Sequence, residues 1–252
     1  MIDTHAHYDD PRFDGDRDEL LSALPENGVQ WVLTCADSTQ SCEAVARLAE
    51  KHPNVWAACG IHPHNASRVD WAAFEPRLCQ YLARPKCVCL GEIGLDYHYD
   101  FSPRGVQREV FAKQLALAAK LDMPVSVHIR EATQDSLELL RQYRPRGVVH
   151  CFTGSLETAQ ILLDLGLYLG FGGAVTFKNA KKPLEAAVFC PLDRLLLETD
   201  APYMAPEPFR GRRCDSTHIR CTAEKIAGAR GITAGELIRA ADENAVRLLG
   251  VR

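Results

Sequence analysis

The sequence has no run of uncharged apolar residues long enough to span a membrane. It also has no N-terminal segment with the basic start, apolar core and small-residue cleavage site of a secretory signal. The net charge of -4 at pH 7 argues against a globally basic nucleic-acid-binding protein, but it is compatible with a local basic patch. We therefore expect a cytoplasmic protein with no membrane partner and no obligate protein partner.

The ten cysteines include no CxxC pair, so neither a zinc ribbon nor a thioredoxin-like redox site is indicated. Most of them lie inside apolar runs, where a free cysteine behaves as a small buried hydrophobic residue. Because a secretory signal is also lacking, we expect these thiols to be reduced. Cys214 and Cys221 lie in a polar segment, and they are the two thiols for which we expect reactivity.

At 252 residues the chain has the length of one large domain or of two small ones, and α/β barrels often reach this size as a single domain. The composition, with 46% hydrophobic and 25% charged residues, is that of an ordinary globular protein. A chain of this length buries about three quarters of its unfolded surface, so it needs no disulfide or metal for stability. No linker or low-complexity segment divides the sequence. We therefore expect residues 1–252 to form one domain.

Eight short apolar runs, rich in β-branched residues, alternate with longer amphipathic stretches. The runs begin at Met1, Val29, Val55, Cys87, Pro124, Gly147, Leu167 and Arg194. Between and after them, apolar residues recur every three or four positions, as in a helix with one buried face. The clearest of these stretches are 103–122, 131–143, 155–166, 222–231 and 232–250.

Near-continuous apolar strands that alternate with helices indicate a parallel sheet covered by helices. Eight such units in 252 residues predict an α/β fold of the TIM (β/α)8 barrel type, followed by two extra C-terminal helices. A doubly wound open sheet is the structural alternative. Ser155 is expected to begin one helix, and Gly231 and Gly250 are expected to end the last two.

The first apolar run contains two histidines separated by one residue. Because residues i and i+2 of a β-strand point to the same side, His5 and His7 are expected on one face, opposite Thr4 and Ala6. This is a ligand geometry for a metal ion, provided that further ligands come from elsewhere in the chain. The alternatives are a solvated N-terminal tail or a remnant of an expression tag.

Histidines and carboxylates lie at or just after the ends of the predicted strands. The set comprises His5, His7, His62, Glu92, His128, His150 and Asp200. Because the C-terminal strand ends of a barrel surround its active site, these side chains are expected to converge. They exceed the three protein ligands of a mononuclear catalytic zinc, and they suit two divalent ions that share a carboxylate and promote displacement at phosphorus. The imidazole and carboxylate mixture suits Zn, Mn, Fe or Ni better than Mg.

Six motifs occur in a characteristic order along the chain. They are DTHAH (3–7), GIHPH (60–64), GEIGLDY (91–97), HIREA (128–132), HCFTGS (150–155) and ETDAPYMAP (198–206) followed by RGRR (210–213). Together they resemble the TatD family of metal-dependent hydrolases, in the amidohydrolase superfamily, over essentially the whole chain. The resemblance implies a TIM barrel and metal-dependent deoxyribonuclease activity, either as a 3′ to 5′ exonuclease or as an endonuclease.

The resemblance also implies a role for each ligand. One metal ion would be held by His5, His7, Glu92 and Asp200. The second would be held by Glu92, His128 and His150, with Glu92 bridging the two. Asp200 and Glu92 are thus the expected catalytic residues, with Asp200 placed to orient or deprotonate the attacking water.

Further polar residues near the strand ends are candidates for substrate binding. His62 and His64 follow the third strand and can contact a phosphate or the leaving oxygen, although His64 alternatively only orders its loop. Arg130, two residues after His128, is placed for bidentate phosphate binding if the strand extends so far. Asp96 is interpreted either as a carboxylate that holds a ligand histidine or as a simple loop residue.

Basic residues also follow the seventh and eighth strands. They are Lys178, Lys181, Lys182, Arg210, Arg212 and Arg213. Positive charge at this end of a barrel favours binding to a nucleic-acid backbone, so DNA is the expected substrate; a solvated basic loop is the alternative. Family members usually continue with Asn-Glu-Pro, whereas residues 214–218 read Cys-Asp-Ser-Thr-His. We expect this difference to alter the entrance of the site and to leave the metal ligands unchanged.

Two other functions are compatible with the same barrel. The first is a small-molecule hydrolase that cleaves an amide, lactone or phosphoester, because the same ligand set can serve each of these reactions. The second is a non-catalytic binding protein, and the complete ligand set argues against it. The basic loop residues favour nucleic acid over a small molecule.

Overall fold

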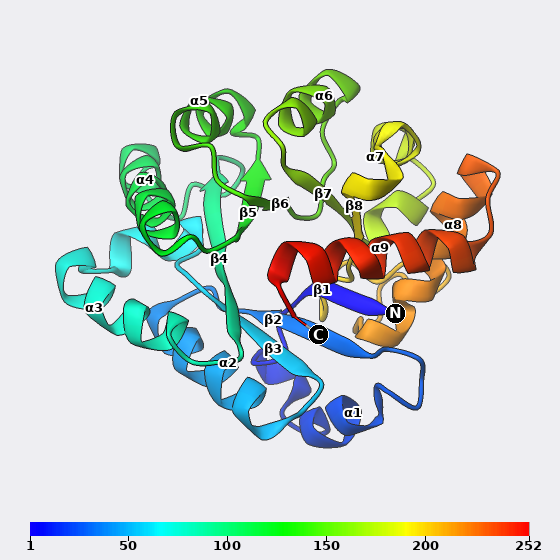
Figure 1. Ribbon diagram of the computed structural model, residues 1–252, viewed down its shortest axis with the longest axis horizontal. Helices are drawn as coiled ribbons and strands as arrows, with labels where there is room; N and C mark the ends of the chain where they lie inside the picture. The colour runs from blue at the N-terminus through cyan, green and yellow to red at the C-terminus, as the bar shows by residue number, and fades with distance from the viewer. Residues whose placement is uncertain (252) are drawn as a thin grey trace.

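A computed structural model describes residues 1–251 and contains one eight-stranded sheet. All seven adjacent strand pairs are parallel, and the strands follow one another in chain order. Helices surround the sheet on its outside (Figure 1). The strands are β1 (Ile2–Ala6), β2 (Trp31–Cys35), β3 (Val55–Cys59), β4 (Cys87–Asp96), β5 (Val125–Arg130), β6 (Gly147–Val149), β7 (Tyr168–Phe171) and β8 (Leu195–Leu197). Each of the eight predicted runs begins at the first residue of one of these strands or at most two residues before it.

The sheet nearly closes where β8 returns to β1. Ala6 and Ala201 form a parallel bridge, and the main-chain N–H of Asp200 donates to the carbonyl oxygen of His5 at 2.9 Å. The hydroxyl of Thr4 adds a hydrogen bond of 2.9 Å to the carbonyl oxygen of Leu197. Consecutive strand order and this contact between the first and last strands confirm the TIM-type barrel, and they exclude the doubly wound open sheet.

The helices that link the strands are α1 (Arg17–Ala23), α2 (Thr39–Lys51), α3 (Trp71–Leu82), α4 (Arg104–Leu121), α5 (Thr133–Tyr143), α6 (Leu156–Asp164) and α7 (Lys181–Phe189). Two further helices, α8 (Ile219–Arg230) and α9 (Ala234–Leu249), follow β8, as predicted. Short 3-10 turns are η1 (Pro11–Phe13), η2 (Pro63–Arg68), η3 (Gly173–Thr176), η4 (Leu192–Arg194) and η5 (Ser216–His218). The Ser155 side chain caps α6, and Gly231 and Gly250 end α8 and α9 with φ angles of 70° and 67°.

Helix α9 covers the N-terminal end of the barrel. It packs against β8 and β1, close to both chain termini (Figure 1). Its Asp242 accepts a hydrogen bond of 2.8 Å from the main-chain N–H of Ile2, and Leu248 belongs to the same buried cluster as Ile2. Because apolar packing fills this end, the opposite end, where the strands finish, is the one left for polar side chains.

Buried apolar side chains between the strands and the outer helices form the main core. All ten cysteines lie within the described residues and none forms a disulfide, in agreement with reduced thiols. The expected reactivity of Cys214 is wrong, because its side chain is fully buried and burial raises the pKa of the thiol. Burial also raises the pKa of Cys221, so neither thiol has the environment of a reactive cysteine. Within residues 1–251 no helix is both long and apolar enough to cross a membrane.

Candidate metal centre

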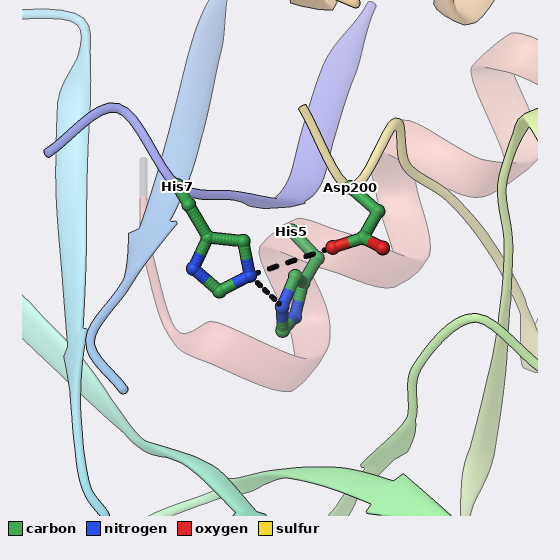
Figure 2. Close-up of side chains that lie close together, drawn as sticks. All are labelled: His5, His7 and Asp200. Atoms are coloured by element: carbon green, nitrogen blue, oxygen red, sulfur yellow. Dashed lines mark hydrogen bonds and ion pairs between the residues drawn. The ribbon is translucent and has the colours of Figure 1, made fainter. Parts of the chain in front are cut away.

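The ends of five strands bring histidine and carboxylate side chains together at the C-terminal end of the barrel. His5 lies in β1 and His7 directly follows that strand, while Asp200 lies three residues after β8. Figure 2 shows these three side chains facing one another across the junction between β1 and β8. The Nε2 atoms of His5 and His7 are 3.3 Å apart, and His7 Nε2 lies 3.4 Å from Asp200 Oδ1. The two histidines thus share one face, as their spacing predicts.

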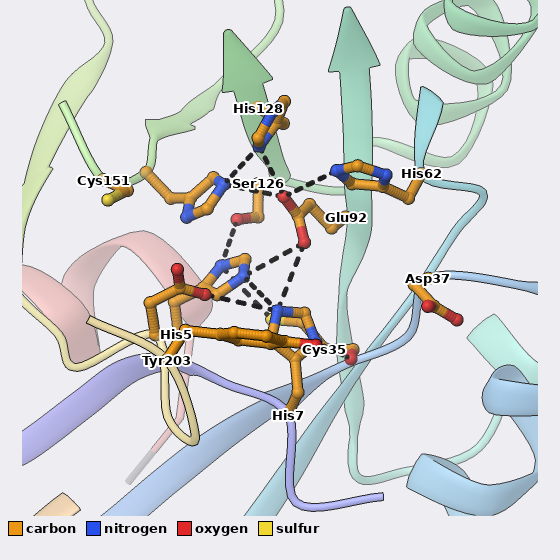
Figure 3. A network of polar contacts seen from close by, with 12 residues as sticks. His5, His7, Cys35, Asp37, His62, Glu92, Ser126, His128, Cys151 and Tyr203 are labelled. Atoms are coloured by element: carbon orange, nitrogen blue, oxygen red, sulfur yellow. Dashed lines mark hydrogen bonds and ion pairs between the residues drawn. The ribbon is translucent and has the colours of Figure 1, made fainter. Parts of the chain in front are cut away.

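Glu92, from the middle of β4, lies at the centre of the cluster, and its two carboxylate oxygens face different histidines (Figure 3). Oε2 is 3.3 Å from His5 Nε2 and 3.4 Å from His7 Nε2. Oε1 is 2.9 Å from His128 Nδ1 and 2.7 Å from His150 Nε2. The carboxylate therefore separates the histidines into two groups, and each group has one oxygen of its own.

Hydrogen bonds behind two of the rings decide which nitrogen faces the cluster. The Nδ1–H of His7 donates to the carbonyl oxygen of Cys35 at 2.9 Å, so Nε2 is the nitrogen that faces Glu92 and Asp200. The Nε2 of His128 lies 3.1 Å from Oδ2 of Asp96, so Nδ1 is the nitrogen that His128 presents to Glu92. The interpretation of Asp96 as a carboxylate that holds a candidate ligand histidine is supported by this contact.

His5 and His150 stack on each other with ring centroids 3.8 Å apart and planes inclined by 10°. The Nδ1 of His5 is 3.0 Å from the hydroxyl oxygen of Ser126. The Nδ1 of His150 lies 3.7 Å from Oε1 of Glu198, a fully buried carboxylate at the end of β8. Each stacked ring therefore has a polar neighbour behind it and directs Nε2 toward Glu92.

His62 also faces Glu92, but it presents a different group. The main-chain N–H of His64 donates to Nδ1 of His62 at 3.1 Å, so this nitrogen carries the lone pair. Burial lowers the pKa of His62 well below its usual value, and the neutral ring therefore has its proton on Nε2. Its Nε2 lies 3.5 Å from Glu92 Oε1, so His62 offers the cluster an N–H donor instead of a metal-binding lone pair.

His64 is directed away from this centre. Its Nε2 lies 3.0 Å from Oδ2 of Asp96, the same oxygen that contacts His128. His64 also contributes its main-chain N–H to His62. Of the two histidines predicted as substrate contacts, the structure places only His62 against Glu92, and His64 holds the loop and Asp96.

The charges of the cluster depend on one another. Burial opposes ionisation of Glu92, but the surrounding histidines outweigh burial and hold the pKa of Glu92 well below its usual value. Burial likewise opposes the charged form of His7, whereas Asp200, Glu92 and Asp9 raise the pKa of His7 to about 10. Glu92 is therefore an anion within a ring of imidazoles, which is the electrostatic arrangement of a cation-binding site.

The predicted arginines lie outside the cluster. Arg130, at the end of β5, is exposed and its guanidinium lies 4.7 Å from the centroid of the Tyr99 ring. Arg210 is exposed and lies over the Phe177 ring at 4.3 Å, while Arg212 is exposed. Arg213 forms an ion pair of 2.5 Å with Asp16, so part of the positive charge of the RGRR segment is neutralised within the chain.

Residues 214–218, which differ from the usual family pattern, contact residues of the first strand and of the loop that follows it. Ser216 donates from its hydroxyl to Oδ2 of Asp3 at 2.6 Å, and its main-chain N–H donates to the Tyr8 hydroxyl at 3.0 Å. Cys214 is buried, and Asp215 caps the η5 turn. The expectation that residues 214–218 shape the entrance is therefore wrong for Cys214 and Ser216, because both side chains are inside the protein.

Sequence reasoning missed three residues that contact the cluster. Ser126 and Glu198 lie behind His5 and His150, and Asp3 accepts hydrogen bonds from Thr199 and Ser216 beneath the β1 and β8 ends. Glu198 had a signal in the sequence, since it precedes Asp200 by two residues in the same motif. The position of Glu198 also accounts for the glycine at residue 170, because a Cβ atom there would lie only 2.3 Å from Glu198 Oε2.

These side chains fit divalent metal ions. Three groups have ligand atoms that lie within 4.8 Å of one another: His5, His7 and Asp200; His5, Glu92 and His150; and His62, Glu92 and His128. The predicted ligands all occur in these groups; His62 lies in the third group, but it presents Nε2–H to Glu92 and not a lone pair. Imidazole nitrogens with a fixed second nitrogen, together with buried carboxylates, form the donor set of borderline transition metals. A barrel whose strand ends converge on such a set defines a metal-dependent hydrolase of the TIM-barrel class.

Comparison with known proteins identifies the family. The family model for TatD related DNase matches residues 2–250, and the chain belongs to this family. It is 38% identical to the uncharacterized metal-dependent hydrolase YabD of Bacillus subtilis, over 100% of this chain and 99% of that protein. It is 33% identical to the 3′-5′ ssDNA/RNA exonuclease TatD of Escherichia coli, over 100% of this chain and 99% of that protein.

A solved structure agrees with this assignment. The crystal structure of YjjV, a TatD homologue from E. coli, superposes with a TM-score of 0.94 at 33% identity and covers 100% of this chain and 98% of its own. The resemblance to the TatD family and the predicted fold are both confirmed.

Proposed function

We propose that this protein is a metal-dependent nuclease that hydrolyses phosphodiester bonds of nucleic acid at a dinuclear centre. One observation carries the proposal: Glu92 directs Oε2 to His5 and His7, and Oε1 to His128 and His150. A carboxylate with separate histidine partners on each oxygen is suited to bridge two metal ions. When bound, such ions would supply Lewis acidity at a phosphoryl oxygen and would lower the pKa of a water molecule.

The ligand sets follow from the two oxygens of Glu92. His5, His7 and Asp200 lie on the side of Oε2, and they would hold one ion together with Glu92. His128 and His150 lie on the side of Oε1 and would hold the other ion with the same carboxylate. Zn, Mn, Fe or Ni suits the imidazole-rich set, and Mg suits it less.

Asp200 and His62 have complementary roles in this proposal. The surrounding histidines, with His7 foremost, outweigh burial and lower the pKa of Asp200, so its carboxylate is ionised and can accept a proton from the attacking water. As the water oxygen attacks phosphorus, the ester P–O bond opposite to it breaks and the leaving oxygen takes up a proton. His62 presents Nε2–H to the site and would donate a hydrogen bond to a phosphoryl or leaving oxygen.

Nucleic acid is the proposed substrate for two reasons. Relatives that are 33% to 35% identical over the whole chain carry the name 3′-5′ ssDNA/RNA exonuclease. In addition, Arg130 is exposed at the end of β5, and Arg210 and Arg212 are exposed in the segment after β8, where they can contact a phosphate backbone. A single-stranded DNA or RNA substrate leaves its bases unpaired, and such a strand can pass the metal centre with its backbone inward.

A cleavage assay with reconstituted metal tests the proposal. The purified protein is stripped of metal, reloaded separately with Zn, Mn, Ni and Mg, and incubated with labelled single- and double-stranded DNA, RNA, and small ester, lactone and amide substrates. We expect release of nucleotides from single strands in at least one metal form. Cleavage of the small substrates alone would replace the nuclease with a small-molecule hydrolase. Loss of nucleic-acid cleavage in Glu92→Gln, with the matched surface variant Glu138→Gln unaffected, excludes a contaminating nuclease.

A further inference from the structure

Two exposed aromatic rings stand beside the metal centre on the loop between β4 and α4. The exposed fraction is 49% for Tyr99 and 64% for Phe101, and their rings stack with centroids 5.1 Å apart and planes inclined by 12°. Exposed rings of this size lose the hydrophobic free energy that burial would provide, so a pair of them on one loop is a surface for a ligand.

The pair is joined to the cluster through His64. The His64 ring lies edge-on to Phe101 at 4.8 Å and to Tyr99 at 5.5 Å between centroids. On its other side, His64 contacts Asp96, whose Oδ2 atom also contacts His128. The aromatic pair is therefore linked through His64 and Asp96 to the candidate ligand His128.

The loop that carries the rings is fixed by hydrogen bonds. The Oδ1 atom of Asp96 accepts the main-chain N–H groups of His98 and Tyr99, each at 3.0 Å. The Ser102 hydroxyl donates to the carbonyl oxygen of His64 at 3.0 Å, and Gln107 donates to the carbonyl oxygen of Ser102 at 2.8 Å. Because the backbone is already ordered, a ligand that stacks on the rings pays little additional conformational entropy.

A cation accompanies the aromatic pair. The guanidinium of Arg130 lies 4.7 Å from the Tyr99 centroid, and Arg130 projects from the end of β5 two residues after His128. Aromatic rings interleaved with arginine form the surface on which proteins bind single-stranded nucleic acids, with bases stacked on the rings and phosphates near the cation. A double-stranded substrate would not use this surface in the same way, because its bases are already stacked.

We propose that Tyr99 and Phe101 form a stacking platform for an unpaired base of the nucleic-acid strand whose phosphodiester lies at the metal centre. This inference rests on the proposed nuclease function and assigns the residues that hold a base flanking the scissile bond. Phe101, with the larger exposed fraction, is the main stacking surface, and Arg130 contacts the adjoining phosphate. Every base can stack on an aromatic side chain, so the platform favours single strands over double strands without a preference for sequence.

Two substitutions at Phe101 distinguish the effect of base stacking from the effect of side-chain size. Phe101→Leu keeps an apolar side chain but removes the aromatic face, whereas Phe101→Tyr keeps the face. Phe189→Leu is the matched control, because Phe189 is 45% exposed at the last residue of α7, where the chain turns back toward the N-terminal strand ends. Circular dichroism and thermal unfolding confirm that each variant is folded. Each is assayed on oligothymidylate and on a strand in which every nucleotide is an abasic tetrahydrofuran residue.

We expect Phe101→Leu to raise KM for oligothymidylate by about 5-fold or more and to leave KM for the abasic strand unchanged, as removal of one base–aromatic stack predicts. Phe189→Leu is expected to retain the wild-type values, and Phe101→Tyr, which keeps the aromatic face, is expected to have a lower KM for oligothymidylate than Phe101→Leu. The inference is overturned if Phe101→Leu has the wild-type KM for oligothymidylate, or if it raises KM equally for both strands.

A binding measurement keeps the inference distinct from the nuclease proposal. Should the wild type cleave neither strand, the proposed function fails, and the platform is tested by fluorescence of a single strand that contains 2-aminopurine. Quenching by the wild type that is relieved by Phe101→Leu supports stacking on the platform. Absence of quenching, or equal quenching by both proteins, overturns it.

Discussion

The Nε2 atom of His128 lies 3.1 Å from Oδ2 of Asp96, and this contact fixes the nitrogen that His128 presents to Glu92. Asp96 is buried and also accepts the main-chain N–H groups of His98 and Tyr99, so its carboxylate cannot turn away from His128. One carboxylate thus orients a candidate metal ligand and the loop beside it.

We predict that Asp96→Asn lowers metal affinity by about 10- to 100-fold, because the amide can accept the main-chain hydrogen bonds but stabilises the His128 N–H less than a carboxylate does. Metal titration with a competing chelator measures this change. Asp100→Asn, on the exposed surface of the same loop, serves as the control. Equal affinity in Asp96→Asn and the wild type would show that the orientation of His128 does not depend on Asp96.

Replacement of Glu92 tests its proposed role as the carboxylate shared by two metal ions. Glu92→Gln keeps the shape of the side chain but removes the charge that faces two histidine groups, so the bound metal is expected to fall from two ions to one or none. Activity is expected to fall by more than about 100-fold, since a ligand contributes more than an outer hydrogen-bond partner. Elemental analysis of the purified variant, beside Glu138→Gln, measures the metal content. Retention of two ions would contradict the bridging role.

Removal of metal is expected to abolish catalysis and to leave the barrel folded. The apolar core between strands and helices does not involve the candidate ligands, so far-ultraviolet circular dichroism should be unchanged after chelation. The melting temperature should fall, because an ion that binds only the native state stabilises it by about 2.7 kcal/mol at a concentration 100 times its Kd. Loss of secondary structure on chelation would instead assign the metal a structural role.

The exposed side chain of Arg212 leads to a prediction about how salt affects the binding of single-stranded nucleic acid. Replacing Arg212 with alanine is expected to weaken binding of single strands and to reduce the slope of log K against log salt concentration by about 0.7. Fluorescence anisotropy over a series of salt concentrations measures that slope. Arg141→Ala, an exposed position near the end of α5, is the matched control. An unchanged slope would remove Arg212 from the contacts with phosphate.

Asp10 provides a pH-dependent prediction away from the metal ligands. The Arg12 side chain hydrogen-bonds Asp10 and lowers the pKa of that carboxyl to about 2, and Arg12 in turn covers the Tyr203 ring. Because the folded state has the lower pKa, this stabilisation is complete above the ordinary aspartate value and is lost as pH falls toward 2. We expect Asp10→Asn to cost about 1 kcal/mol at pH 6, after allowance for solvent screening, and about half as much at pH 3.

Urea unfolding of wild type and Asp10→Asn at the two pH values measures the difference in free energy of unfolding. Asp14→Asn is the control, because Asp14 is an exposed carboxylate on the same segment. A difference that grows as pH falls would have the wrong sign for a carboxylate stabilised in its ionised form.

The local sequence determined the repeating units and many candidate ligands. Buried parallel strands need nearly continuous apolar runs, and helices packed on one side need apolar residues every three or four positions, so both patterns were visible along the chain. The pairing of His5 with His7 followed from strand alternation alone. Because parallel strand ends meet at one end of a barrel, even the convergence of His128, His150 and Asp200 with this pair was predictable.

Tertiary structure decided what each polar atom faces. Sequence position did not reveal that Glu92 divides the histidines between its two oxygens, that His62 presents N–H while His64 turns to Asp96, or that Glu198 lies behind His150. Nor did it show that Cys214 and Ser216 are buried. These relations join residues from strands and loops far apart in the chain, and a hydrogen bond depends on distance and direction that only the packed barrel sets.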